Sequence, residues 1–197
     1  MLFEITTLEK MISDAHSLTI VLILDFLYNS VNLKKIMRQG WIDKLSIMRP
    51  ESVADHTFSM AVIGMVLSDL EGYDTEKILK MIILHDLAES IIGDITPEQK
   101  ERTEKLNLEN NTMLRILSLL PENIKNQYET IWTEFQNHES QESKFVHEID
   151  KLEMALQAKI YSKEIDPSEK IIPFVNYAKE GIKDPNILKL FNQIYSK

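Results

Sequence analysis

Apolar residues recur along most of the chain at the three- and four-residue spacing that is typical of α-helices. The strict alternation of apolar and polar residues that marks β-strands is not found over any useful length. The pattern predicts helices over residues 18–37, 52–70, 78–92, 98–120, 121–136, 144–165 and, as one helix or two, 174–195. We therefore expect an all-α fold, a single-domain bundle of about six to eight helices.

Glycines and polar stretches predict where these helices end. Gly40 is expected to end the first helix, and residues 41–51 are expected to form a loop. Gly93 is expected to end the third helix. The segment 52–70 is apolar all round, which is typical of a central helix and not of a surface helix. Residues 1–17 show no strong period, and we expect them to form a leading extension.

Composition and charge narrow the class of protein. A length of 197 residues fits one domain over residues 1–197, and 44% hydrophobic with 27% charged residues is typical of soluble globular proteins. The formal net charge of -9 disfavours binding to nucleic-acid backbones, and the absence of cysteine excludes disulfides and zinc–thiolate sites. The apolar run 18–24 is too short to span a membrane, and the N-terminus does not resemble a secretory signal. We expect a cytoplasmic protein without a membrane or nucleic-acid partner.

The apolar segment 78–92 contains three ionisable side chains that a plain core helix would exclude. On a continuous helix Glu89 lies four residues after His85 and three after Asp86, so the three groups gather on one side. Burying a neutral polar group without a partner costs roughly 2–7 kcal/mol, and burying a charge costs more. A metal ion is the simplest partner that all three groups can share. Asp94 follows in the turn after this helix.

Two more polar residues interrupt helices that are otherwise apolar. His56 lies in the first turn of the most apolar helix, and Asp150 interrupts the apolar side of a later one. With His85 and Asp86 they offer two imidazoles and two carboxylates, a set that suits Mn, Co, Fe or Zn with positions left for water and substrate. Spacing alone leaves two other interpretations open. These residues can be satisfied polar groups of the core, or Asp150 can form a ligand pair with His147, three residues before it.

The order of these residues resembles a known family. His56, then His85 with Asp86, then Asp150 is similar to the metal-dependent phosphohydrolases of the HD-domain family, which is named after the His-Asp pair. Five segments are similar to the 5′-deoxynucleotidase branch of that family, namely 40–41, 49–56, 85–89, 93–95 and 145–158. The resemblance extends from about residue 22 to the last helix. It is more specific for the family than for the substrate.

The resemblance implies a role for each matching residue. The metal ligands fall on His56, His85, Asp86 and Asp150. The ion is a divalent metal such as Mn, Co, Fe, Zn or Mg, and a single ion is expected because the spare histidines show no dinuclear pattern. The catalytic residues fall on Glu89, which acts on the attacking water, and on Asp94, which contacts the substrate. The substrate-binding residues fall on Trp41 beside the sugar and on Lys100 near the phosphate.

The sequence departs from the family at one position. Characterised bacterial members carry an arginine directly before the tryptophan, where it orients the phosphate, but here that residue is Gly40. The loop between Trp41 and His56 is also about one residue longer than in relatives. Arg49 and Lys44 are the candidates to replace the missing cation.

The resemblance implies a homodimeric 5′-deoxynucleotidase that hydrolyses deoxyribonucleoside 5′-monophosphates to deoxynucleoside and phosphate. Two alternatives stay open. Hydrolases of alarmones or cyclic nucleotides share the same ligand order, although Trp41 and the Gly93–Asp94 turn favour the monophosphatase. A non-catalytic regulator that binds metal or nucleotide is the second alternative, but it would not need Glu89 and Asp94.

Overall fold

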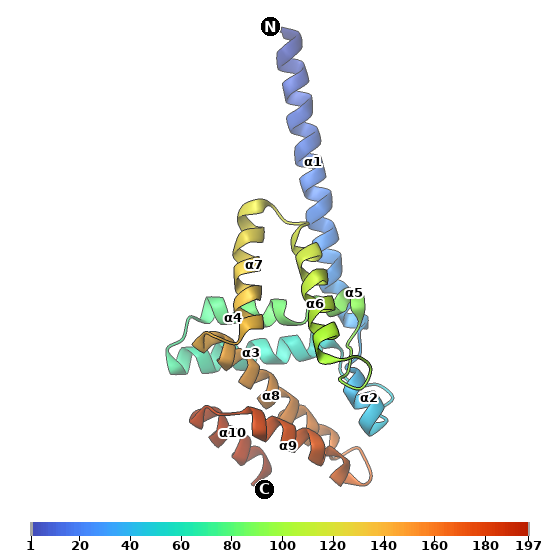
Figure 1. The fold of residues 1–197 in the computed structure, drawn as a ribbon, viewed down its shortest axis with the longest axis vertical. Coiled ribbons are helices and arrows are strands. Elements are labelled where there is room, and N and C mark those ends of the chain that lie inside the picture. The colour runs from blue at the N-terminus through green and yellow to red at the C-terminus, as the bar shows by residue number, and fades with distance from the viewer. Residues whose placement is uncertain (1, 197) are drawn as a thin grey trace.

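The structure, a computed structural model, describes the backbone of residues 2–196 and the side chains of residues 17–196. Within these residues the regular elements are all helical (Figure 1). They are α1 (Leu2–Asn32), η1 (Leu33–Lys35), α2 (Gln39–Leu45), α3 (Val53–Glu71), α4 (Thr75–His85), α5 (Glu89–Ile92), α6 (Arg102–Leu117), α7 (Glu122–Asn137), α8 (Gln141–Tyr161), η2 (Ser168–Ile171), α9 (Ile172–Gly181) and α10 (Pro185–Tyr195), where η marks a 3-10 helix. The expected all-α fold is confirmed. The helix count agrees roughly with the expectation, because α2 and α5, with 7 and 4 residues, are short additions to the longer helices.

The first helix is longer than the sequence pattern predicts, and it ends earlier. α1 takes in the expected leading extension and projects beyond the rest of the molecule (Figure 1). It ends at Asn32, whose side-chain amide donates to the Ser90 carbonyl at 2.6 Å. Met37 then pairs with Ser52 in an isolated antiparallel bridge. The predicted helix end at residue 37 is wrong because these contacts with distant segments turn the chain sooner.

A short helix, α2, lies where the sequence pattern predicts a loop. Trp41 and Leu45 are four residues apart and both buried, so they share one face of a helix. The helix ends at Ser46, which has a left-handed φ of 57°. The apolar partners of Trp41 are the rings of Tyr161 and Phe174, more than a hundred residues further along the chain. No local pattern indicates such partners, and the prediction of a loop is therefore wrong for this segment.

A capping box fixes the start of α3. The Ser52 Oγ accepts a hydrogen bond from the Asp55 backbone N–H at 3.2 Å, and the Asp55 carboxylate accepts one from the Ser52 N–H at 2.9 Å. This arrangement satisfies two backbone donors that a helix leaves free at its start. It places His56 in the first turn, on the same buried face as Val53 and Met60.

The central helix, α3, is buried on only one face. That face packs against α4 and α8. The other face carries exposed apolar side chains, namely Phe58, Val62, Met65, Val66 and Leu70. The helix is apolar all round, as its sequence indicates, but the expectation that such a helix lies away from the surface is wrong for this second face. By length and composition α3 would suffice to cross a membrane, but its buried face carries the imidazole of His56 and packs on other helices.

The helix predicted over residues 78–92 is broken in the middle. α4 ends at His85, the chain turns through residues 86–88, and α5 begins at Glu89. Asp86 has φ -110° and ψ 10°, and its carbonyl accepts a hydrogen bond from the Glu89 N–H at 3.0 Å. Leu87 and Ala88 are buried although they lie in the turn. The apolar pattern of the sequence therefore continues through the turn and predicts an unbroken helix. The break matters because adjacent side chains on a regular helix point about 100° apart, whereas here the Asp86 carboxylate lies 3.0 Å from the His85 ring.

The long helix α8 lies between the helices that precede it in the bundle and the two C-terminal helices. It packs against α3, α4 and α7 on one side and against α9 and α10 on the other (Figure 1). Its apolar face is fully buried through Val146, Ile149 and Ala155. Asp150 projects from the same helix and reaches His56 on α3. The site is therefore built where α3, the end of α4 and α8 meet.

Candidate metal centre and active site

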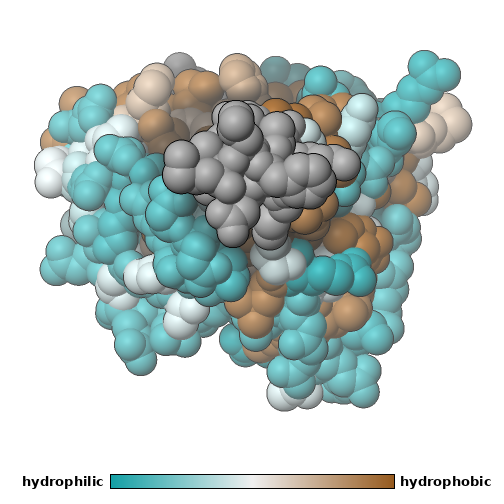
Figure 2. Space-filling view, turned by 90° about the horizontal axis from the view of Figure 1, so that it is seen from above, coloured by the Kyte–Doolittle hydropathy of each residue, from teal (hydrophilic) through white to brown (hydrophobic). Residues whose placement is uncertain are grey.

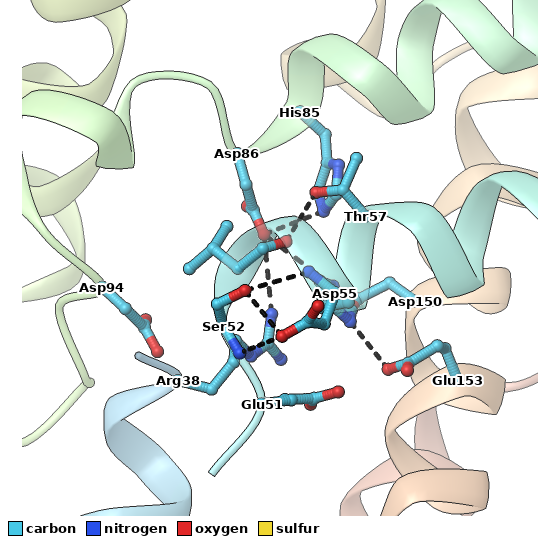
Figure 3. Close-up of polar contacts among 12 residues, drawn as sticks. Arg38, Glu51, Ser52, Asp55, Thr57, His85, Asp86, Asp94, Asp150 and Glu153 are labelled. Atoms are coloured by element: carbon cyan, nitrogen blue, oxygen red, sulfur yellow. Dashed lines mark hydrogen bonds and ion pairs between the residues drawn. The ribbon is translucent and has the colours of Figure 1, made fainter. Parts of the chain in front are cut away.

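The four expected metal ligands lie together in the structure, and Figure 3 labels three of them, His85, Asp86 and Asp150. His85 Nε2 lies 3.0 Å from Asp86 Oδ2. His56 Nε2 lies 3.4 Å from Asp150 Oδ1 and 3.8 Å from Asp86 Oδ2. The fold thus gathers two imidazoles and two carboxylates from three separate stretches of sequence.

Each imidazole presents one nitrogen to this cluster and uses the other to fix its orientation. His85 Nδ1 donates to the Ile82 carbonyl at 2.5 Å, and His56 Nδ1 donates to Glu153 Oε2 at 2.7 Å. Both Nε2 atoms are buried and make no hydrogen bond with any described group. Ligand atoms of His56, His85 and Asp86 lie within 4.8 Å of one another, which is close enough for a single ion. Unpaired buried nitrogens beside carboxylates form a donor set that suits a divalent metal, so the residues present fit such an ion.

Charged neighbours keep both carboxylates of the cluster ionised. Burial works against the charge of Asp86, but the two imidazoles and Arg38 outweigh burial and lower the pKa of Asp86. Burial also opposes the charge of Asp150, yet Lys151 and the neighbouring His56 hold the pKa of Asp150 well below its usual value. The Lys151 Nζ lies 2.7 Å from Asp150 Oδ2. Both groups are therefore anionic at neutral pH, as metal ligands must be.

His56 carries a proton when no metal is bound. Burial and the charge of Arg38 lower the pKa of this imidazole, but Asp150 and Glu153 raise it more, to about 9. A cation that binds at Nε2 displaces that proton. The affinity of the site for metal should consequently increase as the pH rises toward about 9.

Glu89, the expected catalytic base, lies at the start of α5 with its side chain buried. The residue is 4% exposed, and its Oε2 has no hydrogen-bond partner among the described residues. Burial and the charges of Asp86 and Asp94 raise the pKa of Glu89 well above its usual value, against smaller opposing effects of Arg38 and Lys105. A carboxyl group of raised pKa beside the expected ligands is suited to general-base catalysis, because it binds a proton more readily than an ordinary carboxylate does. The turn after α4, and not a shared helix face, brings it to the site.

Asp94 connects the segment after α5 to the start of α2. Its Oδ2 accepts a hydrogen bond from the Gln39 backbone N–H at 2.7 Å. Gly93, the residue before it, has a φ of 78°, in the left-handed region that favours glycine. Asp94 therefore helps to position Arg38, the neighbour of Gln39. A direct contact between Asp94 and a substrate stays a prediction.

The sequence interpretation missed Arg38, which lies at the centre of the charged cluster (Figure 3). Its Nη1 lies 3.5 Å from Asp86 Oδ2, and its side chain is 17% exposed. Burial by itself would lower the pKa of the guanidinium. The surrounding carboxylates together outweigh burial and raise this pKa above its usual value. Those carboxylates belong to Asp86, Asp150, Asp94 and Glu89. A permanent cation therefore lies among the metal ligands and the expected catalytic groups.

Arg38 lies among the carboxylates of the site, whereas neither of the two cations that the sequence suggested in place of the arginine expected at Gly40 lies there. Lys44, one of the two candidates, pairs with Glu98 at 2.9 Å. Arg49, the other, is exposed on the loop and makes no ion pair or hydrogen bond with the described residues. The signal for Arg38 was its position two residues before Gly40. The helix predicted over residues 18–37 obscured this signal, because Arg38 then read as a charge at the end of a helix and not as a residue of the site.

A second missed cation is Lys105, which lies closer to the site than the expected Lys100. Lys100 has its Nζ 3.8 Å from the exposed Glu104 and contacts none of the metal ligands. Lys105 donates to the Ile95 carbonyl at 2.7 Å and pairs with Glu109 at 3.4 Å. Burial lowers the pKa of Lys105, but Glu109 and then the carboxylates of the site raise it above its usual value. Lys105 thus holds α6 to the segment that follows Asp94.

Trp41 is part of the core in this structure and does not line an open pocket. The residue is 2% exposed. Its ring packs against Phe174, with centroids 4.4 Å apart, and against Tyr161 at 5.3 Å. The indole N–H donates to Glu51 Oε1 at 2.8 Å. The contact with a sugar that was expected of Trp41 would need a movement of the chain, and it stays a prediction.

His147 does not join the ligands, so the alternative pair with Asp150 is wrong. Its Nε2 donates to the Phe135 carbonyl at 3.1 Å. Its ring stacks between Phe135 at 4.1 Å and His138 at 3.6 Å. Burial lowers the pKa of His147 to about 4, which keeps the ring neutral at neutral pH.

Comparison with known proteins identifies relatives over most of the chain. The model of the HD domain family matches residues 31–182. The 5′-deoxynucleotidase HDDC2 of Homo sapiens is 33% identical over 173 residues, which cover 87% of this chain and 84% of that protein. The 5′-deoxynucleotidase hdd1 of Schizosaccharomyces pombe is 36% identical over 185 residues, which cover 91% and 90%.

Solved structures show the same fold. The PH0347 protein of Pyrococcus horikoshii OT3 is 31% identical and has a TM-score of 0.71, with coverage of 87% of this chain and 97% of that chain. A conserved hypothetical protein of Pyrococcus furiosus is 26% identical, also with a TM-score of 0.71, over 88% and 99%. The family match begins at residue 31, so it excludes most of the projecting helix α1.

Proposed function

This chain belongs to the HD domain family, and on that premise we propose that it is a metal-dependent 5′-deoxynucleotidase. The observation that carries the proposal is the convergence of two ionised carboxylates with two buried imidazole nitrogens that make no hydrogen bond with the described residues. Arg38 and Glu89, which a purely structural metal site would not need, lie beside them. The names of the relatives supply the substrate class, deoxyribonucleoside 5′-monophosphates.

His56, His85, Asp86 and Asp150 would hold one divalent ion. When bound, such an ion stabilises negative charge that develops on a phosphate and makes water more acidic. Oxygen and nitrogen ligands without thiolates suit Mn, Co, Fe, Zn or Mg, and the site chemistry favours the first four because half of its ligands are imidazoles.

Three side chains of the protein bind the phosphate, activate the water and orient the substrate. Arg38 offers its guanidinium to the phosphate. Among the described residues its ion pair is with Asp86 and is long, at 3.5 Å, which leaves other N–H groups available. Glu89 holds the attacking water and takes its proton. Asp94 orients the sugar hydroxyl or that water from the turn after α5. The products are a deoxynucleoside and inorganic phosphate.

The direct test is phosphate release from a panel of deoxy- and ribonucleoside 5′-monophosphates, with metal-stripped protein restored by Mn, Co, Zn or Mg. We expect metal-dependent release from the deoxynucleotides. A protein that binds metal but is inactive on the whole panel would contradict the proposal. Activity on alarmones or cyclic nucleotides would then identify another hydrolase of the family, and inactivity on these as well would favour a regulator.

Replacing Arg38 by methionine should raise KM for the nucleotide by about tenfold to a hundredfold. A hydrogen-bonded charge pair contributes about 1.5–3 kcal/mol, and methionine keeps much of the volume of the side chain without its charge. Steady-state kinetics across a range of nucleotide concentrations measures the effect. Arg115→Met is the matched control, because Arg115 is exposed on α6, and its guanidinium makes no ion pair or hydrogen bond with the described residues. An unchanged KM in Arg38→Met would remove the phosphate role.

We also propose that the protein is a homodimer. Two helices present apolar side chains to solvent: the stripe along α3, from Phe58 to Leu70, and a stripe along α1 that contains Leu18, Val21, Leu24, Tyr28 and Val31. Apolar side chains also gather at several places on the surface viewed from above in Figure 2. Exposed apolar patches of this extent are typical of protein interfaces, and a second copy of the chain offers a self-complementary partner.

The double substitution Val62→Glu and Val66→Glu should convert the dimer to a monomer. Both side chains lie on the exposed stripe of α3, at 44% and 48% exposure, so the change adds charge where the partner would bury it. Light scattering after size-exclusion chromatography measures the mass. Ile172→Glu is the control, since Ile172 is 49% exposed on α9. A wild-type monomer, or a dimer that survives the double substitution, would contradict this interface.

A further inference from the structure

Glu153 is a buried carboxylate that no step of the proposed reaction uses. It lies on α8, three residues after Asp150, and is 3% exposed. Its Oε2 accepts the hydrogen bond of His56 Nδ1–H at 2.7 Å. Asp150 Oδ1 lies 3.4 Å from the other nitrogen of the same ring. One turn of α8 therefore contacts both nitrogens of His56.

The two histidines of the site are oriented by different groups. The Nδ1 of His85 is bound by the Ile82 carbonyl, three residues earlier on the same helix, so its orientation is set locally. The Nδ1 of His56 is bound by a side chain from another helix, 97 positions away in the sequence. An ionised carboxylate is also a stronger acceptor than a carbonyl and makes the opposite nitrogen a better metal ligand.

A second carboxylate lies near His56 but is held by other groups. Ligand atoms of Glu51, His56 and Glu153 lie within 4.8 Å of one another. The Oε1 of Glu51, however, accepts the hydrogen bond of Trp41 Nε1–H at 2.8 Å. Among the described residues, Glu153 is therefore the carboxylate that is hydrogen-bonded to the Nδ1 of His56.

We propose that Glu153 is a positioning residue for the metal site. By accepting the Nδ1 proton it fixes the tautomer and the plane of the His56 ring, so that the lone pair of Nε2 faces the ion. It touches neither the ion nor the substrate, and it acts through His56. This inference rests on the proposed function only in so far as the four ligands bind a divalent metal.

The test is the affinity of Glu153→Gln for Mn²⁺ and Zn²⁺, measured by isothermal titration and by competition with a chelating dye. Glutamine keeps the size of the side chain, but it loses the negative charge and can offer its amide N–H to Nδ1. We expect the affinity to fall about tenfold to a hundredfold, as for other residues that orient metal-binding histidines. At saturating metal, KM for the nucleotide should stay within about twofold of the wild type. Glu153→Asp should recover part of the lost affinity.

Glu51→Gln is the matched control, because it changes a neighbouring carboxylate that is not bonded to His56. We expect less than about a threefold change in metal affinity. A spectroscopic readout is independent of activity: in the Zn²⁺-loaded protein the ¹⁵N signals of His56 should report a protonated Nδ1, and this signal should shift in Glu153→Gln. Thermal unfolding of both metal-free variants checks that they are folded.

Each result decides between distinct conclusions. A wild-type protein that binds no divalent metal would overturn the proposed function itself. Metal binding by the wild type with unchanged affinity in Glu153→Gln would overturn the positioning role alone. Equal losses in Glu153→Gln and Glu51→Gln would overturn it as well, because the effect would then be one of general charge.

Discussion

Glu89→Gln should lower kcat by about two to four orders of magnitude while the protein still binds its metal. Glutamine has the shape of glutamate but cannot accept a proton, and general-base catalysis contributes about 10²–10⁴-fold to a rate. The substitution should not unfold the protein, because Oε2 of Glu89 has no hydrogen bond to lose among the described residues. Phosphate release at saturating substrate and metal titration measure the two properties separately.

The pH profile supplies a second check on Glu89. A base works only when it is deprotonated, and burial with Asp86 and Asp94 raises the pKa of this carboxyl well above its usual value. In the wild type kcat should therefore fall as the pH drops through that raised pKa, and this acid limb should vanish in Glu89→Gln. Glu142→Gln, an ion-paired glutamate on α8 that lies outside the site, should behave as the wild type. A near-normal rate in Glu89→Gln would exclude the role of Glu89 as the base.

Asp86→Asn should abolish activity by removing the metal. Asp86 is the residue whose one carboxylate oxygen approaches His56, His85 and Arg38 together. Its loss removes a negatively charged ligand oxygen and leaves the guanidinium of Arg38 beside two imidazoles. Residues that only orient a ligand contribute about tenfold to a hundredfold to metal affinity, so the loss of a ligand should cost about a hundredfold or more. Titration with Mn²⁺ or Zn²⁺ and phosphate release should both report the loss.

The contrast between the two variants is the informative result. Glu89→Gln should separate metal binding from turnover, whereas Asp86→Asn should lose both. Asp43→Asn is the control for the second, since Asp43 is exposed and hydrogen-bonded only to Gln39 among the described groups. Normal metal affinity in Asp86→Asn would show that the ligand set is wrong.

The sequence indicates the ligand candidates because a polar side chain within an apolar segment is costly to bury unless it has a partner. His56, His85, Asp86 and Asp150 each interrupt an apolar stretch of the sequence, and they meet in the structure. The spacing itself did not show that they meet. That inference came from their resemblance to a family.

What the sequence could not indicate depends on contacts between distant segments. The turn after His85 has the same apolar pattern as a helix, because Leu87 and Ala88 are buried either way. The place of Arg38 in the site depends on Asp86, 48 residues further on. The burial of Trp41 depends on Phe174, which lies on the other side of the chain's midpoint. Local periodicity contains none of this information.

The proposed metal ligands come from α3, from the end of α4 with the turn after it, and from α8, and this arrangement has a consequence for the lifetime of the protein. An ion that joins these elements acts as a reversible cross-link that closes long loops of the chain. Ligand binding to the native state alone adds stability that grows with the logarithm of the free ion concentration. The fraction of unfolded molecules that proteases can degrade should therefore follow the metal supply. Shortage of the ion would lower the amount of this protein as well as its activity.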